Sequence, residues 1–139
     1  LRWLRRDLRH NPNRCVAAIW HHPLYSSGSH GANAHVKPIW RTLMRARAEL
    51  AVTGHDHHFE AFGPQDENGV LRPRTGLRQF VVGTGGRSLY PTPGAAPNSE
   101  NLVEGNFGAL ALNLRPGGWS WSFIAEDGRT LAADSGRCR

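Results

Sequence analysis

The 139-residue sequence is 39% hydrophobic, which suffices for one packed domain and argues against a disordered chain. Its formal net charge of +6 comes almost wholly from arginine, since Lys37 is the only lysine. Apart from Arg2, Arg5, Arg6 and Arg9 the charges are scattered, with no aromatic residues interleaved in a basic run. This pattern does not favour nucleic-acid binding. The sequence contains neither an apolar run long enough to span a bilayer nor a signal peptide.

The chain begins with a pattern typical of an amphipathic helix. Leu1, Leu4 and Leu8 recur at helical spacing with arginines between them, and the proline of the Asn-Pro-Asn at residues 11–13 is expected to end the helix. The run CVAAIW at residues 15–20 is continuously apolar. It predicts a short strand buried on both faces.

A strand, a helix and a second strand are predicted between residues 15 and 54. A loop rich in Ser, Gly and Asn precedes the helix, whose apolar face carries Val36, Ile39, Trp40, Leu43 and Met44. Residues 50–54 predict the second buried strand. Together these form a βαβ unit, whose strands run parallel with a right-handed crossover. Both strands then end at one edge of the sheet, so we expect His21 and His55 to lie side by side there.

From residue 59 onward the sequence favours strands. They are predicted at residues 59–62, 77–86, 107–114 and 119–125, and the last two flank a Pro-Gly-Gly turn that indicates a hairpin. Residues 90–106 are rich in Pro, Gly and Asn and are expected to form a long surface loop. We find no internal repeat and no linker that would divide the chain into two domains.

The histidines are grouped in a way that favours metal binding. His55 and His57 are two residues apart, so in an extended segment both side chains point to one side, and each could bind one ion of a two-metal centre. His21 can supply a further imidazole. A structural zinc site is less favoured because neither cysteine is near these residues in sequence. The alternative is that the histidines are ordinary surface residues.

Cys15 and Cys138 are the only cysteines, and they lie near opposite ends of the sequence. This placement favours one long-range disulfide in an oxidising compartment over a metal-binding knuckle. It therefore favours a secreted, periplasmic or extracellular protein. Two unrelated buried thiols are the alternative.

The motif WHHP, followed by SHG and then by GHDHH, resembles the C-terminal half of a calcineurin-like metallophosphoesterase. The resemblance is strongest to the purple acid phosphatase branch, and QFVVGTGG and DSGRC extend it over nearly the whole chain. It implies an α/β fold: the C-terminal half of a four-layer α/β/β/α sandwich, in which a βαβ unit is followed by antiparallel strands. We expect one sheet and one helical layer of that sandwich in residues 1–139, with the upstream half of the domain outside this sequence.

The resemblance also implies roles for single residues. His21 and His55 would bind one metal ion and His57 the other, the ions being divalent or trivalent Fe, Zn or Mn. His30, which precedes Gly31, matches a histidine that faces the substrate and would protonate the leaving group or hold the phosphate. A solvated loop histidine is the alternative for His30. His58 receives no role and is expected at the surface.

Two departures from the family pattern matter. Ala61 occupies the place where the family often has an arginine, although Glu60 is kept. The family has three earlier motifs upstream of its His-x-Pro motif, namely Asp-x-His, Gly-Asp-x-x-Asp or Tyr, and Gly-Asn-His, which supply the bridging carboxylate; none of them occurs before WHHP in this sequence. The chain by itself therefore contains only part of the expected metal centre.

The resulting functional hypothesis is a secreted, metal-dependent phosphoric-ester hydrolase, similar to an acid phosphatase and using a dinuclear centre and metal-bound hydroxide. Its partners would be a phosphate-ester substrate and the missing N-terminal half of the domain, with no membrane partner and no nucleic acid. The 139-residue piece alone is expected to be inactive. The alternative hypothesis is a non-catalytic domain that binds anions or nucleic acid.

Overall fold

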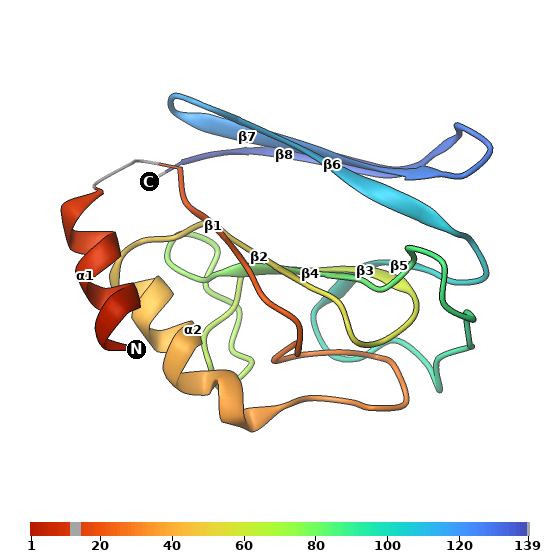
Figure 1. Cartoon of the computed structure of the whole chain (residues 1–139), viewed down its shortest axis with the longest axis horizontal. Coiled ribbons are helices and arrows are strands. Elements are labelled where there is room, and N and C mark those ends of the chain that lie inside the picture. Colours follow the sequence, from red (N-terminus) through yellow and green to blue (C-terminus); the bar gives the residue numbers. More distant parts are fainter. Residues whose placement is uncertain (12–14, 139) are drawn as a thin grey trace.

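The computed structural model describes residues 1–11 and 15–138, arranged in three layers (Figure 1). The helices α1 and α2 cover one face of a five-stranded sheet, and a three-stranded sheet covers the other face. The helices are α1 (Arg2–His10), the short 3-10 helix η1 (Ala34–Val36) and α2 (Lys37–Arg45). The strands are β1 (Ala17–Ile19), β2 (Leu50–Thr53), β3 (Phe59–Phe62), β4 (Arg78–Val82), β5 (Ser99–Val103), β6 (Gly108–Arg115), β7 (Gly118–Ala125) and β8 (Thr130–Arg137).

The larger sheet has the strand order β1-β2-β4-β3-β5. Strand β1 pairs with β2 in parallel, with Ala17 opposite Leu50, and β2 pairs with β4 in parallel. These pairings confirm the predicted βαβ unit. Strands β3 and β5 complete the sheet in antiparallel orientation.

Alternation along β2 divides the core into two parts. Leu50 packs between the two sheets with Phe59 and Phe80, whereas the next residue, Ala51, packs against the helical layer with Trp40. Successive strand residues point to opposite faces, so one four-residue strand contributes to both parts. Leu4 and Leu8 of α1 pack against the helical part, as the helical spacing predicted.

The three-stranded sheet is an antiparallel meander of β6, β7 and β8. It joins the larger sheet through aromatic contacts: the rings of Phe59 and Phe123 stack at 4.3 Å, and those of Phe80 and Trp121 meet edge-on at 5.1 Å. The predicted hairpin is confirmed, because Arg115 pairs with Gly118 across the turn. The chain thus contributes strands to two sheets, whereas one sheet was expected.

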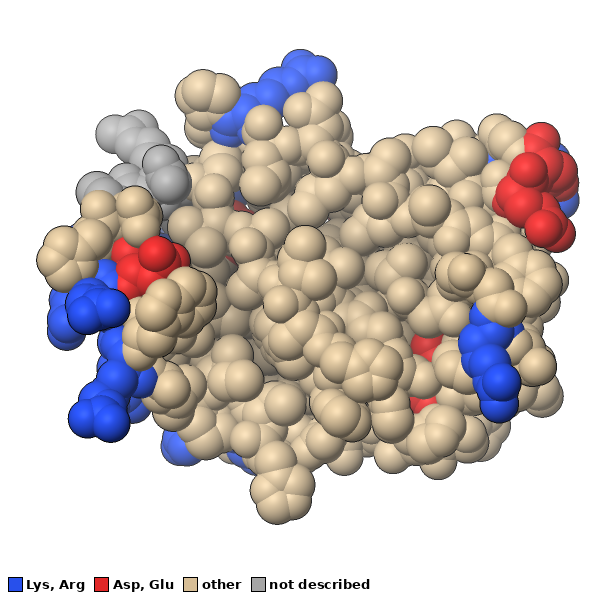
Figure 2. Space-filling model, viewed as in Figure 1, with Lys and Arg blue, Asp and Glu red and all other residues tan. Residues whose placement is uncertain are grey.

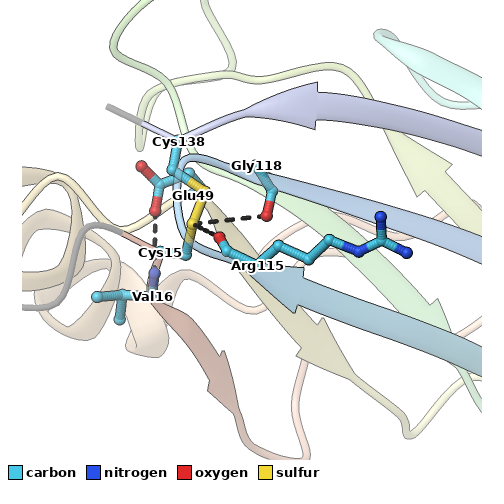
Figure 3. Close-up of a disulfide and its surroundings, with 6 residues drawn as sticks. All are labelled: Cys15, Val16, Glu49, Arg115, Gly118 and Cys138. Carbon is cyan, nitrogen blue, oxygen red and sulfur yellow. Dashed lines mark hydrogen bonds between the residues drawn. A yellow bond between two sulfur atoms is a disulfide. The ribbon is translucent and has the colours of Figure 1, made fainter.

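A disulfide between Cys15 and Cys138 links the end of the three-stranded sheet to the segment before β1, as predicted (Figure 3). The two Cα atoms are 5.2 Å apart, an ordinary spacing for a disulfide. Cys15 Sγ lies 2.9 Å from the carbonyl oxygen of Arg115, the last residue of β6 before the hairpin turn. Beside it, the backbone N–H of Val16 donates to Glu49 Oε2 at 3.0 Å, just before β2 begins. The covalent link therefore joins the starts of the parallel strands to the second sheet.

Two strands were not predicted, and one was predicted to be more buried than it is. Residues 90–106 are not one loop, because β5 lies within them and pairs with β3. The residues of strand β8, TLAADSGR, have a low propensity for strands, and the strand forms by pairing with β7. Strand β1 forms an edge of the sheet with Ile19 78% exposed, so it is not buried on both faces. The predicted helix stop at residues 12 and 13 lies outside the described residues.

The surface expectation for His58 was wrong, because this side chain is fully buried. His58 Nε2 lies 3.1 Å from Oε2 of the equally buried Glu60. Glu60 Oε2 also accepts the backbone N–H of Ser27 at 2.9 Å, and Glu60 Oε1 accepts the Ser27 hydroxyl at 2.5 Å. These bonds attach the loop that carries His30 to strand β3. A charged group inside the fold needs such partners, which explains why His58 turns inward.

The outer side of α1 carries the arginine cluster. Figure 2 shows that most of the visible face is uncharged and that basic side chains gather on the side where α1 lies. None of the residues of α1 is buried. In the part of the chain that the structure describes, no helix has both the length and the apolar character needed to cross a membrane.

Removing the disulfide is expected to destabilise the chain. The bond closes a loop with a sequence separation of 123 residues, which restricts the unfolded chain. The double variant Cys15→Ser/Cys138→Ser should lower the free energy of unfolding by about 2–4 kcal/mol, measured by urea denaturation. Thiol counting in denaturant provides the control, since the oxidised parent should show no free thiol. Equal midpoints for parent and variant would contradict this role.

Glu60 should make the stability of the chain depend on acid pH. Burial acts to raise the pKa of the Glu60 carboxyl, but hydrogen bonds from His58, Ser27 and Ser99 outweigh it and lower the pKa. A lowered pKa stabilises the fold above the unfolded value of about 4.3, and this stabilisation is lost as the pH falls through the folded value. Glu60→Gln should cost about 1–3 kcal/mol at pH 7 and flatten that acid dependence.

The matched control for this prediction is Glu126→Gln, at an exposed position in the turn after β7. It should leave the free energy of unfolding and its pH dependence unchanged. Urea denaturation at several pH values from 3 to 7 compares the three proteins. If Glu60→Gln and Glu126→Gln behaved alike, the buried carboxylate would not be the anchor of the Ser27 loop.

Candidate metal centre

The candidate site lies where the parallel strands β1, β2 and β4 end. His21 and His22 follow β1, and residues 54–58 follow β2. The backbone N–H of Gly54 donates to His21 O at 3.0 Å, which continues the strand pairing into the site. Ends of parallel strands are where α/β proteins commonly build ligand sites, because the loops converge there.

His21 and His55 lie side by side, as predicted. His21 Nε2 is 3.1 Å from His55 Nδ1. His22 joins them: one nitrogen from each of His21, His22 and His55 lies within 4.8 Å of the other two. The ring of His30 is next to this group, with its centroid 4.6 Å from that of His55. Four imidazoles therefore meet at one edge of the sheet.

The backbone at His55 has an uncommon conformation that suits this arrangement. Its φ of 72° lies in the left-handed region, which non-glycine residues seldom adopt and which is found more often at functional sites. Burial lowers the pKa of His55, and the nearby His22, His30 and His21 lower it further. The ring is therefore neutral near pH 7, and a neutral imidazole keeps a lone pair for a metal ion.

Asp56 positions His30 from inside the fold. Its side chain is fully buried, and Oδ1 accepts from His30 Nδ1 at 2.8 Å and from the His30 backbone N–H at 3.2 Å. The Tyr90 hydroxyl donates to the same oxygen at 3.1 Å, and the Ser26 hydroxyl donates to Oδ2. Burial acts to raise the pKa of Asp56, but these bonds outweigh it and lower the pKa, so the carboxylate is charged.

Two glycines allow the loops to approach this closely. A Cβ atom on Gly28 would lie 2.2 Å from Asp56 Cγ, and one on Gly83 would lie 1.9 Å from the Asp56 carbonyl oxygen. Both distances are far below any real contact, so a side chain at Gly28 would displace the Asp56 carboxylate and one at Gly83 would displace the backbone. The buried carboxylate can therefore lie between the His30 loop and the end of β4.

His57 occupies a separate position. Its Nδ1 lies 2.8 Å from the carbonyl oxygen of Ser88, to which it donates, and its ring is 4.9 Å from that of Tyr90. With the proton held on Nδ1, the lone pair is on Nε2. His57 does not belong to the three-histidine group among the described residues.

Sequence reasoning missed three members of the site. His22 and Asp56 lie inside the motifs WHHP and GHDHH, but no property of either motif indicates that His22 joins the cluster or that Asp56 is buried. Tyr90 comes from the segment after β4, and its hydroxyl reaches Asp56 across 34 residues of sequence. Only long-range packing brings these three side chains to the histidines.

No protein-family model matches the sequence, and no curated protein matches it. Solved structures nevertheless share its fold. GAP50, the anchor in the inner membrane complex of Plasmodium, superimposes with a TM-score of 0.81 at 17% sequence identity, over 98% of this chain and 41% of that chain. Purple acid phosphatase PPD1 from yellow lupin (Lupinus luteus) seeds superimposes with a TM-score of 0.82 at 19% identity, over 96% of this chain and 27% of that chain.

The chain spans less than half the length of either solved structure. At such low sequence identity the likeness concerns the fold alone. A parallel-containing sheet, an antiparallel sheet and few helices agree with the expected α/β class. The chain has a metallophosphoesterase-like fold and corresponds to a C-terminal fragment of it.

Proposed function

We propose that this chain is the C-terminal part of a metal-dependent phosphoric-ester hydrolase of the acid-phosphatase type. The observation that carries the proposal is the contact of His21 Nε2 with His55 Nδ1 at 3.1 Å, beside His30, at the ends of parallel strands. Imidazole nitrogens at this spacing suit a transition-metal ion, and a further histidine beside them suits proton transfer. The fold shared with a purple acid phosphatase supports the same reaction class.

In this proposal His21 and His55 hold one metal ion and His57 holds a second. The donor chemistry fits, because His55 is neutral near pH 7 and His57 presents Nε2 while Nδ1 binds Ser88 O. Bound metal ions of this kind polarise the phosphoryl group and make water a better nucleophile. The residues of the chain then orient the ester and supply protons.

His30 is the proposed acid. Asp56 and the backbone hold its ring with Nδ1 facing inward, so Nε2 is the nitrogen available to a substrate. The side chain is 49% exposed, which leaves room for an ester beside it. As the bond from phosphorus to the leaving oxygen breaks, His30 Nε2 would give its proton to that oxygen and release a neutral alcohol.

Oxygen ligands would have to come from a further segment. Among the described residues the carboxylate that contacts the cluster is Asp56, and its oxygens already accept from Ser26, His30 and Tyr90. Two metal ions held by imidazoles alone would carry a large uncompensated charge. We infer that the upstream half of the domain supplies the carboxylates. The exposed Ile19 on edge strand β1 supports packing of that half beside β1.

A secreted or extracellular location is part of the proposal. The Cys15–Cys138 disulfide is compatible with it, since such bonds form and persist in oxidising compartments.

The central test is metal-dependent hydrolysis of an aryl phosphate by the full-length gene product. His55→Ala should lower kcat/KM by about a hundredfold or more, because it removes a ligand of the metal ion. Removing the metal with a chelator should abolish turnover, and adding it back should restore activity to the parent but not to the variant. Initial rates followed by release of the aryl alcohol provide the measurement.

His35→Ala is the matched control, since this exposed histidine in η1 contributes only its backbone to a described hydrogen bond. It should hydrolyse the ester at the parental rate. The 139-residue chain alone should show negligible turnover because it lacks the carboxylates. Equal rates for the parent and His55→Ala would remove His55 from the centre, and enzyme-like rates from the short chain would disprove the need for an upstream half.

The role of His30 can be tested by changing the leaving group. His30→Ala should lower kcat about 10²-fold or more for an alkyl phosphate, whose alcohol leaves only when protonated. It should lower kcat far less for a nitrophenyl phosphate, whose anion leaves unaided. Asp56→Asn should show the same selectivity to a smaller degree, because the His30 ring loses its charged partner. A loss of equal size for both esters would indicate that His30 only helps bind the phosphate.

A second candidate function is a non-catalytic anion-binding domain, which is favoured by the exposed Arg2, Arg5, Arg6 and Arg9 on α1. Metal analysis of the full-length protein separates the two candidates. About two metal ions per chain would support the hydrolase. A metal-free protein that binds polyanions in a salt-dependent way would support the second candidate.

A further inference from the structure

The group formed by His21, His22 and His55 contains a residue to which the proposed hydrolase gives no role. His22 lies between the His21 ligand and Pro23, and its side chain is exposed. Its ring centroid is 4.5 Å from that of His55 and 4.8 Å from that of His21. The backbone at His22 is held in place, because Trp20 Nε1 donates to the His22 carbonyl oxygen at 2.7 Å. The exposed ring can rotate on this anchored backbone.

The nitrogen spacings match what a single small cation needs. In tetrahedral coordination with Zn–N distances of about 2.0–2.1 Å, ligand nitrogens lie roughly 3.3–3.4 Å apart. His21 Nε2 and His55 Nδ1 are already 3.1 Å apart, and all three donor atoms lie within 4.8 Å of one another. His21 and His22 are exposed, so their side chains have room to rotate toward a shared ion.

We propose that His21, His22 and His55 form a three-imidazole site for one divalent transition-metal ion of the zinc class, complete within this chain. The inference rests on the proposed function only in taking His21 and His55 as ligands of the same ion. Three histidines with one open position are a known donor set for zinc, and imidazole suits this class of metal. His22 thus replaces, at this ion, an oxygen ligand from outside the chain.

His57 is not the third ligand of this site. Its ring is held by the Ser88 carbonyl and lies beside Tyr90, away from the three-histidine group. His30 is not a member of the three-histidine group among the described residues, and in the proposed function its free Nε2 faces the substrate. The ring nitrogens of His22 make no described hydrogen bond to the protein, so both are available to an ion. Three neutral ligands leave the ion with its full positive charge, which favours an anionic fourth ligand such as phosphate.

Zinc binding by the metal-free 139-residue chain tests the site directly, without substrate. Titration with Zn²⁺ against a coloured chelator should give one ion per chain, and His22→Ala should weaken the affinity about 10- to 100-fold. His57→Ala should weaken it much less, and His35→Ala should bind like the parent. Circular dichroism confirms that each variant is folded, which is expected because His22 is exposed.

Two spectroscopic measurements complete the test. Co²⁺ added in place of Zn²⁺ should give the intense visible absorption of a tetrahedral site in the parent and weak absorption in His22→Ala. Imidazole ¹⁵N signals of His21, His22 and His55 should shift on addition of Zn²⁺. Parental affinity in His22→Ala, or a larger loss in His57→Ala, would overturn the proposal, as would a failure of the chain to bind Zn²⁺.

These results are independent of hydrolysis. Suppose that the 139-residue chain binds one Zn²⁺ through His22 but the full-length product has no phosphatase activity. That result would refute the proposed function and support the three-imidazole site. If the full-length product is an active phosphatase but the 139-residue chain binds Zn²⁺ equally well with and without His22, the proposed function stands and the three-imidazole site is refuted.

Discussion

The parallel pairing of β1 with β2 is the constraint on which the site depends. Ala17 lies opposite Leu50 and Ile19 opposite Val52, so both strands reach the same edge of the sheet. The residues that follow them, His21 and His55, then have their ring nitrogens 3.1 Å apart although they are separated by 34 positions in sequence. A shift of one residue in this register would turn every side chain of one strand to the opposite face. The alternation of Leu50 and Ala51 between two cores prevents such a shift.

Buried polar side chains on the strands hold the loop before α2 in place through hydrogen bonds. Gln79 in β4 accepts the backbone N–H groups of Leu24 and Tyr25 through Oε1, at 3.0 Å and 3.2 Å. Glu60 in β3 holds Ser27 in the same loop. Each bond places a loop donor on an acceptor that is buried and therefore costly to leave unpaired. The loop is thereby fixed at both strands, and His30 has a defined position beside His55.

The three-stranded sheet packs against the larger sheet whose strand ends carry the site. Phe123 and Trp121 of β7 pack against Phe59 and Phe80. Phe59 begins β3, the strand that follows GHDHH, and Phe80 lies in β4, which pairs with β3 in the sheet. The disulfide holds this sheet to the segment before β1. The histidine edge, the aromatic contacts between the sheets and the covalent link therefore form one connected structure. The proposed metal ions would bind where the backbone already brings the histidines together, with the exposed His21 and His22 adjusting by side-chain rotation.

The amino-acid sequence by itself determined the elements with a strong local pattern. Apolar runs and helical spacing predicted β1, α2 and β2, and the rule that such strands run parallel then placed His21 next to His55. The tertiary structure alone decided the rest. Strands β5 and β8 exist because they pair with β3 and β7, since their own residues are weak strand formers. The bond between His30 and Asp56 and the approach of His22 to His55 join residues far apart in sequence, and the burial of His58 is a property of the packed fold, so no local pattern carries this information.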